Sequence, residues 1–158
     1  MASLATLSTL FASTFVSVEP AVIMDTFATV CVANIGQAKD QIETAKSTFN
    51  AKDSDVSNKA QTHLISRDYA FDVVDDESAT CAITSQVEET ITFDSFVDDL
   101  SNKLGGNEPN EIIEPNTAYW LIEPHEAEGN FAISLMVASK QGQNLATVMI
   151  SKLEGPIE

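Results

Sequence analysis

Apolar residues recur every three or four positions in three segments of the chain, which is the pattern of amphipathic helices. The first segment begins at Pro20, a residue favoured in the first turn of a helix, and ends at Asn34–Gly36. The second covers residues 37–49. The third follows Thr92, whose hydroxyl can cap a helix, and ends at Gly105–Gly106. We therefore expect three helices.

Alternation of apolar and polar residues, the period of a half-buried strand, replaces the helical period elsewhere. It predicts strands over residues 69–73, 81–85, 117–123, 131–138 and 145–151. The last two have apolar residues on both faces, so they are expected near the centre of a sheet. Residues 50–62 and 107–116 are polar or contain proline, and we expect them to be loops.

The order of these elements predicts an α+β fold, with a roughly five-stranded, mostly antiparallel sheet and two to three helices packed on one face. The order resembles the architecture of small sensor and adaptor modules of the profilin and PAS kind, a likeness of architecture that brings no function. No internal repeat is seen along the 158 residues. We expect one domain over residues 19–158.

The charge of the chain narrows the classes of partner. Eight Lys and Arg stand against 24 Asp and Glu, a formal net charge of −16. Such a field repels phosphate backbones and anionic lipid headgroups, so nucleic acids are not expected as partners. The acids are scattered, which favours a solvated acidic surface; the alternative is a surface that imitates nucleic acid or binds a basic protein.

Residues 2–18 carry no charge and are rich in Ala, Leu, Ser, Thr and Phe. They resemble the apolar part of a secretory signal, although no Lys or Arg precedes them. The run is too short and too rich in hydroxyls for a membrane span, so none is expected in the mature chain. The alternative is an amphipathic first helix or a loose tail on the core. We treat residues 1–18 as a signal-like or loose apolar segment.

The two cysteines, Cys31 and Cys81, allow a single pairing. Cys31 falls in a predicted helix and Cys81 in a predicted strand, so a disulfide would join the helical layer to the sheet. The alternative is two buried free thiols in a reducing compartment. Their apolar surroundings do not favour a reactive thiolate.

No catalytic motif is present: the chain lacks G-x-S-x-G, H-E-x-x-H, C-x-x-C, a phosphate-binding glycine loop and a dinucleotide fingerprint. We expect neither an enzyme nor a resident cofactor. Tyr119 and Trp120 should point to opposite faces of one strand, with Trp120 in the core.

Two acidic segments are candidates for weak cation binding. One is the hairpin that carries Asp72, Asp75, Asp76 and Glu77, where carboxylates on a tight turn could hold calcium, although the spacing of an EF-hand is absent. The other is His125 with Glu126 and Glu128. In both cases the alternative is a set of solvated loop residues.

The stretch FATVCVANIGQAKDQIETA contains a Phe-x-x-x-Cys helix, a small-residue turn and a second helix. With Phe27, Cys31, Asn34, Gly36 and then Cys81, the chain resembles small uncharacterised exported proteins of proteobacteria. It departs from them in lacking a basic leader. The resemblance implies an exported domain with one disulfide and brings no known activity.

Our leading hypothesis is a non-enzymatic exported domain, periplasmic or extracellular, that binds a partner protein or small ligand through its sheet or loops. The alternative is an intracellular, cytoplasmic acidic interaction protein, such as an inhibitor or a phage-borne nucleic-acid mimic. The first predicts a disulfide and a shortened N-terminus, and the second predicts free thiols.

Overall fold

The computed structural model describes residues 17–113, 115–140 and 143–155. Its helical elements are α2 (Pro20–Phe27), which continues into a turn of π-helix, η1 (Ala28–Val32), then α3 (Ala38–Phe49) and α4 (Phe93–Lys103). The strands are β1 (Lys52–Asp53), β2 (Gln61–Ile65), β3 (Ala70–Val74), β4 (Cys81–Val87), β5 (Glu111–Ile113), β6 (Thr117–Ile122), β7 (Phe131–Lys140) and β8 (Gln143–Lys152).

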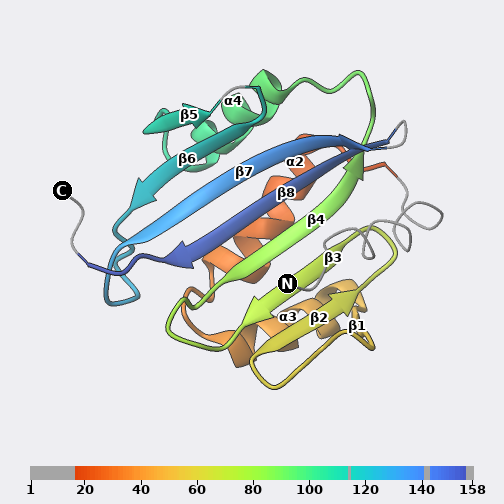
Figure 1. Ribbon diagram of the computed structural model, residues 1–158, viewed down its shortest axis with the longest axis vertical. Helices are drawn as coiled ribbons and strands as arrows, with labels where there is room; N and C mark the ends of the chain where they lie inside the picture. The colour runs from red at the N-terminus through yellow and green to blue at the C-terminus, as the bar shows by residue number, and fades with distance from the viewer. Residues whose placement is uncertain (1–16, 114, 141–142, 156–158) are drawn as a thin grey trace.

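All eight strands form one antiparallel sheet in the order β1-β2-β3-β4-β8-β7-β6-β5. The order describes two four-stranded meanders, each preceded by a helix, whose last strands β4 and β8 pair at the centre (Figure 1). A helix followed by a four-stranded meander therefore occurs twice, with α2 and η1 preceding the first copy, although the amino-acid sequence shows no repeat. The α+β class and the antiparallel sheet predicted from the sequence are confirmed.

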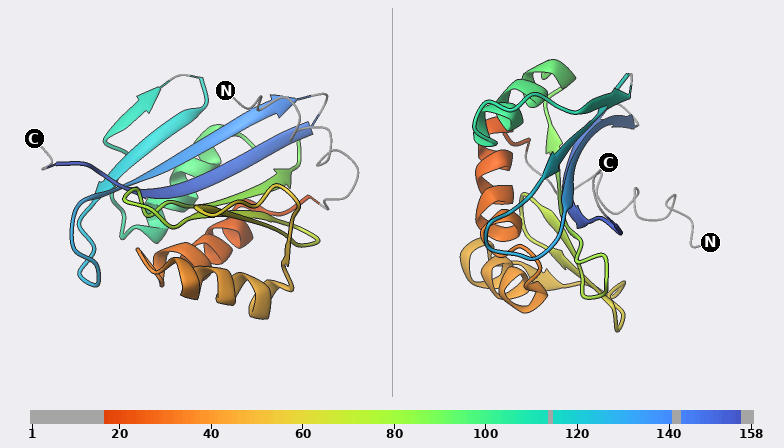
Figure 2. Two further views of the ribbon diagram at one scale, coloured as in Figure 1. Left: turned by 60° about the horizontal axis from the view of Figure 1, so that its bottom comes forward. Right: turned by 90° about the vertical axis from the view of Figure 1, so that its left-hand side faces the viewer.

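The helices lie together on one face of the sheet (Figure 2). Between the two layers lies one core, whose largest fully buried side chains include Phe27 from α2, Phe71 from β3, Phe96 from α4 and Trp120 from β6. The central position predicted for β7 and β8 is confirmed, since β8 pairs with both β4 and β7.

Local signals fix the ends of the helices. Pro20 occupies the first turn of α2. Thr92 accepts a hydrogen bond from the Ser95 amide at its Oγ1, 3.2 Å away, which satisfies one of the free N–H groups at the start of α4. At the other end, Gly105 and Gly106 both have positive φ, a conformation that glycine adopts without steric strain.

The sheet has eight strands where the sequence predicted about five. The three additional strands lie toward the outside of the sheet: β1 and β5 are its two edges, and β2 follows β1. The loops predicted at 50–62 and 107–116 are wrong where β1, the start of β2, and β5 occupy them. These edge strands are two and three residues long with all residues exposed, so they have no alternation to detect. The apolar residues that predict the first helix include Val22, which is 47% exposed in the structure.

Candidate binding surface

On the face of the sheet opposite the described helices, the four central strands present no charged side chain over most of their length. In the four central strands β4, β8, β7 and β6, buried and outward-facing positions alternate. The outward-facing residues are the even-numbered ones in β4 (82–86) and β7 (132–138). In β6 (117–121) and β8 (145–151) they are the odd-numbered ones. All of these positions hold Ala, Ser, Thr, Gln, Leu, Met or Tyr. A chain with a net charge of −16 thus keeps the centre of one whole face neutral.

Strand pairing arranges these side chains in rows. Thr84 lies opposite Thr147, and Thr147 lies opposite Met136. The hydroxyls of Thr84 and Thr147 hydrogen bond to each other at 3.0 Å. A second hydroxyl pair, Thr80 and Ser151, does the same at 2.8 Å. Because these four hydroxyls pair with one another, they add little unsatisfied polar surface beside the methyl and thioether groups of the face.

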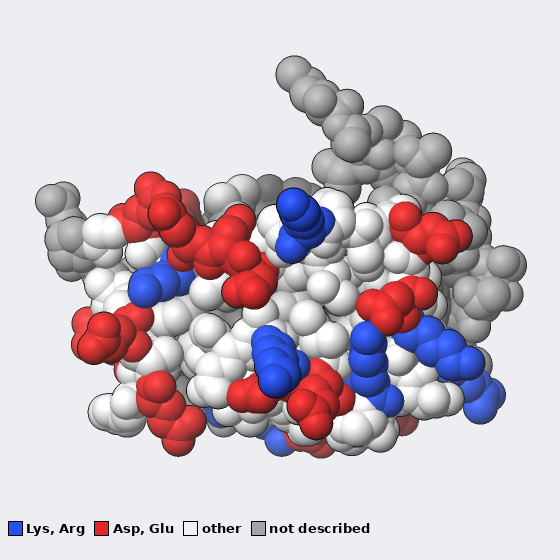
Figure 3. Space-filling view, turned by 90° about the horizontal axis from the view of Figure 1, so that it is seen from below, with Lys and Arg blue, Asp and Glu red and all other residues white. Residues whose placement is uncertain are grey.

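Carboxylates surround this neutral face at the ends of the strands. Asp75, Asp76 and Glu77 lie exposed in the β3–β4 hairpin, and Glu126 and Glu128 lie exposed in the β6–β7 loop at the same end. Figure 3 shows acidic side chains at both ends of the face that it views, with a few basic side chains among them. At the other end, Glu88 and Glu89 follow β4 and are also exposed. The result is a neutral centre with an acidic rim.

The structure brings the two predicted cation segments together at this acidic end. A cavity of about 410 Å³ is lined by Asp76, Glu77, Glu126 and Glu128, and Lys152 also lines it. Lys152 places one positive charge among these carboxylates. Within the described part of the chain, no three His, Cys, Asp or Glu side chains come together as a metal site requires.

The four carboxylates of the predicted hairpin site do not act as one group. Asp72 Oδ1 lies 2.7 Å from Nδ1 of buried His63 and accepts a hydrogen bond from Gln61. Asp76 Oδ1 accepts hydrogen bonds from the amide and the hydroxyl of Ser78, which lower the pKa of its carboxyl. Each of these two carboxylates therefore has a local structural partner, and cation binding at the hairpin stays a prediction. His125 is exposed in the β6–β7 loop.

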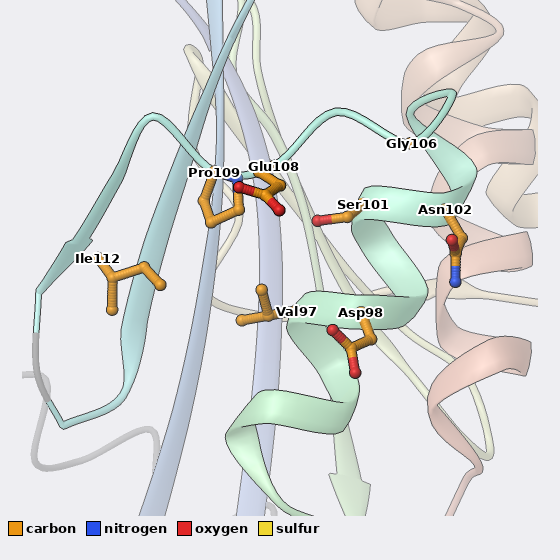
Figure 4. Close-up of a pocket in the computed structure, with 8 residues that line it drawn as sticks. All are labelled: Val97, Asp98, Ser101, Asn102, Gly106, Glu108, Pro109 and Ile112. Carbon is orange, nitrogen blue, oxygen red and sulfur yellow. The ribbon is translucent and has the colours of Figure 1, made fainter.

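A second cavity, of about 570 Å³, lies between α4 and the edge strand β5 (Figure 4). Val97, Asp98, Ser101 and Asn102 of α4 form one wall, and the following loop forms the other with Glu108, Pro109 and Ile112. Ile112 faces the helical layer because it pairs with buried Ala118. This cavity was not predicted from the sequence. It depends on β5, which lies in a segment that the sequence pattern predicted to be a loop.

The Ser101 hydroxyl is the polar atom of this cavity that has no partner. Its oxygen is buried and makes no hydrogen bond within the described residues. Figure 4 shows it directed toward Glu108. Neither Asp98 nor Glu108 takes part in the ion pairs of the described residues, which are Lys46–Asp53, His63–Asp72 and Lys103–Asp25.

The structure joins Cys31 of η1 to Cys81 at the start of β4 in a disulfide, with their Cα atoms 5.5 Å apart. Both residues are fully buried. The bond links the helical layer to the central strand of the sheet, as predicted from the positions of the two cysteines. It is compatible with an oxidising compartment.

None of the described helices is long and apolar enough to cross a bilayer. The signal-like segment lies mostly outside the described residues, which begin at Ser17. No protein-family model, no curated protein and no solved structure matches this chain. The resemblance to small exported proteins therefore stays a proposal. The evidence on function comes from the neutral face of β4, β6, β7 and β8.

Proposed function

We propose that this protein is a non-enzymatic, exported binding domain that contacts a partner protein through the uncharged face of its sheet. The observation that carries the proposal is the absence of charged side chains from the outward-facing positions 82–86 of β4, 117–121 of β6, 132–138 of β7 and 145–151 of β8, in a chain with a net charge of −16. Interfaces between proteins are depleted of charge at their centre, whereas an ordinary solvated face of such an acidic chain would carry carboxylates.

The chemistry of the surface defines the partner. Met136 and Leu121 are 48% and 38% exposed, and the paired hydroxyls around them offer few unsatisfied polar atoms. Such a surface suits an uncharged, largely apolar patch on the partner. The acidic rim suits basic residues around that patch, which would steer the approach of the partner and fix its orientation.

The size of the face supports a partner of protein size. Four strands spaced about 4.8 Å apart, each with about seven residues, span roughly 19 Å by 23 Å. That projected area is about half of the ~800 Å² that each protein contributes to a stable complex. The remainder would come from the rim, so we expect both parts of the surface to take part.

Two observations support export. The Cys31–Cys81 bond belongs to the chemistry of oxidising compartments. The resemblance of the Phe27–Gly36 segment to exported proteins points the same way. Support for a non-enzymatic role comes from the positions of the groups that usually act in catalysis. Both cysteines are in the disulfide, so neither is a thiolate nucleophile.

Site-specific photo-crosslinking tests the proposal. A benzoylphenylalanine at Ser134, in the middle of the neutral face, should give a defined cross-linked product in the native cell envelope. The same group at Ser47, exposed on α3, should not give it. Thr147→Glu should abolish the product, because it places a charge at the centre of the interface, whereas Ser47→Glu should leave it unchanged.

The cross-linking experiment can also contradict the proposal. A product that survives Thr147→Glu, or that forms equally from position 47, would show that binding does not use the neutral face. The intact mass of the native protein gives a separate test of export. A full-length chain with two free thiols would instead support the intracellular alternative.

A further inference from the structure

We propose that the cavity between α4 and β5 binds a small organic ammonium ion with an apolar substituent. The site is separate from the neutral sheet face, because Ile112 lines the cavity from the helical side of β5 while its neighbours Glu111 and Ile113 have the opposite orientation. The inference therefore goes beyond the proposed function and does not depend on it.

The volume and the lining of the cavity suit a small organic molecule. Its volume of about 570 Å³ falls within the range of small-molecule sites. Val97, Pro109 and Ile112 supply the apolar part, and Ile112 is 46% exposed in the absence of an occupant. A bound apolar group would cover Ile112 and remove that surface from water.

The charged residues that line the cavity favour a cation. Asp98 and Glu108 come from opposite walls of the cavity, and no Lys or Arg lines it. Two carboxylates without a counter-ion favour a cation between them. An organic ammonium suits the site better than a metal ion, since calcium requires six to eight oxygen ligands and three of the eight lining residues have apolar side chains.

The Ser101 hydroxyl adds a polar group whose hydrogen-bonding capacity is unused among the described residues. A buried hydroxyl without a hydrogen-bond partner is destabilising, and native proteins keep few of them. The Ser101 hydroxyl is directed toward Glu108 (Figure 4). Glu108 is exposed and forms no ion pair within the described part of the chain. When the Glu108 side chain turns to meet a bound ammonium, the hydroxyl is opened to the cavity and gains a partner.

The indole of Trp120 provides a built-in reporter. Its Nε1 donates a hydrogen bond to the carbonyl of Asn107, 3.1 Å away, and Asn107 lies between the cavity residues Gly106 and Glu108. The chain has one tryptophan, so its fluorescence reports on the surroundings of this single indole, to which the Asn107 carbonyl belongs.

Titration with benzylammonium tests the inference, with benzyl alcohol as the uncharged probe of similar shape. We expect saturable changes in Trp120 fluorescence with a Kd on the order of 1 mM. Amide chemical shifts should change mainly over residues 97–112. Benzyl alcohol should bind at least tenfold more weakly. Asp98→Asn and Glu108→Gln should each weaken benzylammonium about tenfold, and Ile112→Ser about threefold.

Glu111→Gln is the matched control, because it removes one carboxylate from β5 on the opposite face and should leave the affinity unchanged. Four results would overturn the inference. They are equal binding of benzyl alcohol, an equal effect of Glu111→Gln, shift changes scattered over the acidic surface, and displacement of benzylammonium by a stoichiometric amount of calcium. All four carboxylate and isoleucine positions are exposed, so the variants should fold, and circular dichroism would verify this.

Discussion

The indole Nε1 of Trp120 donates a hydrogen bond to the backbone carbonyl of Asn107 at 3.1 Å. This contact ties the buried centre of β6 to the loop that leads from α4 to β5. The ring itself is 1% exposed and fills the core beneath α4. One side chain therefore holds both the core and the wall of the α4–β5 cavity in place.

Trp120→Phe should lower the free energy of unfolding by about 1–3 kcal/mol, through the lost hydrogen bond and the smaller ring. Urea denaturation followed by circular dichroism measures the change. Tyr119→Phe is the control, since Tyr119 lies on the opposite face of the same strand and the change should stay within about 0.5 kcal/mol. Equal effects of the two variants would contradict the position of Trp120 in the core.

The disulfide is expected to contribute strongly to stability. It closes a loop with a sequence separation of 50, for which the chain-entropy estimate is about 4 kcal/mol. The Cys31→Ala/Cys81→Ala double variant should lose this amount in urea denaturation. The wild type unfolded and refolded in the presence of a reductant should show a comparable loss. A loss below about 1 kcal/mol would mean that the bond adds little constraint to the unfolded chain.

Two serines with buried hydroxyls should respond to alanine with stability changes of opposite sign. Ser85 is fully buried, and its Oγ donates to the carbonyl of Asp68 at 2.8 Å. Ser85→Ala should destabilise by about 1–2 kcal/mol, because it removes this bond and leaves the carbonyl with one partner fewer. The Ser101 hydroxyl has no partner, so Ser101→Ala should be neutral or stabilise by up to about 1 kcal/mol. Chemical denaturation of both variants measures the contrast, and a clear loss in Ser101→Ala would contradict it.

Tyr69 should make stability depend on alkaline pH. Burial raises the pKa of its phenol above 10.0; the hydrogen bond with Thr26 acts in the opposite direction, and the charges of Asp68 and Asp25 raise it further. The folded state thus favours the neutral phenol. Its contribution is fully present below the unfolded pKa and is lost as the pH rises through the folded pKa.

Tyr69→Phe is expected to lack this step in the pH dependence. The difference in thermal midpoint between wild type and variant should favour the wild type near neutrality, through the Thr26 hydrogen bond, and should shrink as the pH rises above 10.0. The ionisation of the remaining groups is common to both proteins and cancels in the difference. A constant difference over this range would show that Tyr69 ionises alike in the folded and unfolded states.

The long elements could be predicted from the sequence because each carries its own local signal. The period of the apolar residues defined α3 and α4, and Thr92 and Gly105 marked the ends of α4 where the structure has them. Strands β3, β4, β6, β7 and β8 alternate clearly, since one of their faces is buried throughout. The short strands β1 and β5 are stabilised by pairing with a neighbour rather than by burial, and such pairing leaves no periodic signal.

The candidate surfaces could be predicted only in part. The uncharged residues of β6, β7 and β8 are visible in the sequence, yet their union into one face with β4 depends on the order of the strands. The hairpin and loop carboxylates were both noted from the sequence, but their meeting around Lys152 was not, because residues 76 and 152 are far apart along the chain.

The sequence by itself determined the α+β class, the central hairpin, the acidic character and the single cysteine pairing, since local periodicity, composition and count are properties of the chain. Only the tertiary structure decided that β4 pairs with β8, that the neutral side chains share one face, and that α4 and β5 enclose a cavity. The physical reason is that contacts between distant segments follow from the burial of many side chains at once, and no single segment encodes that choice.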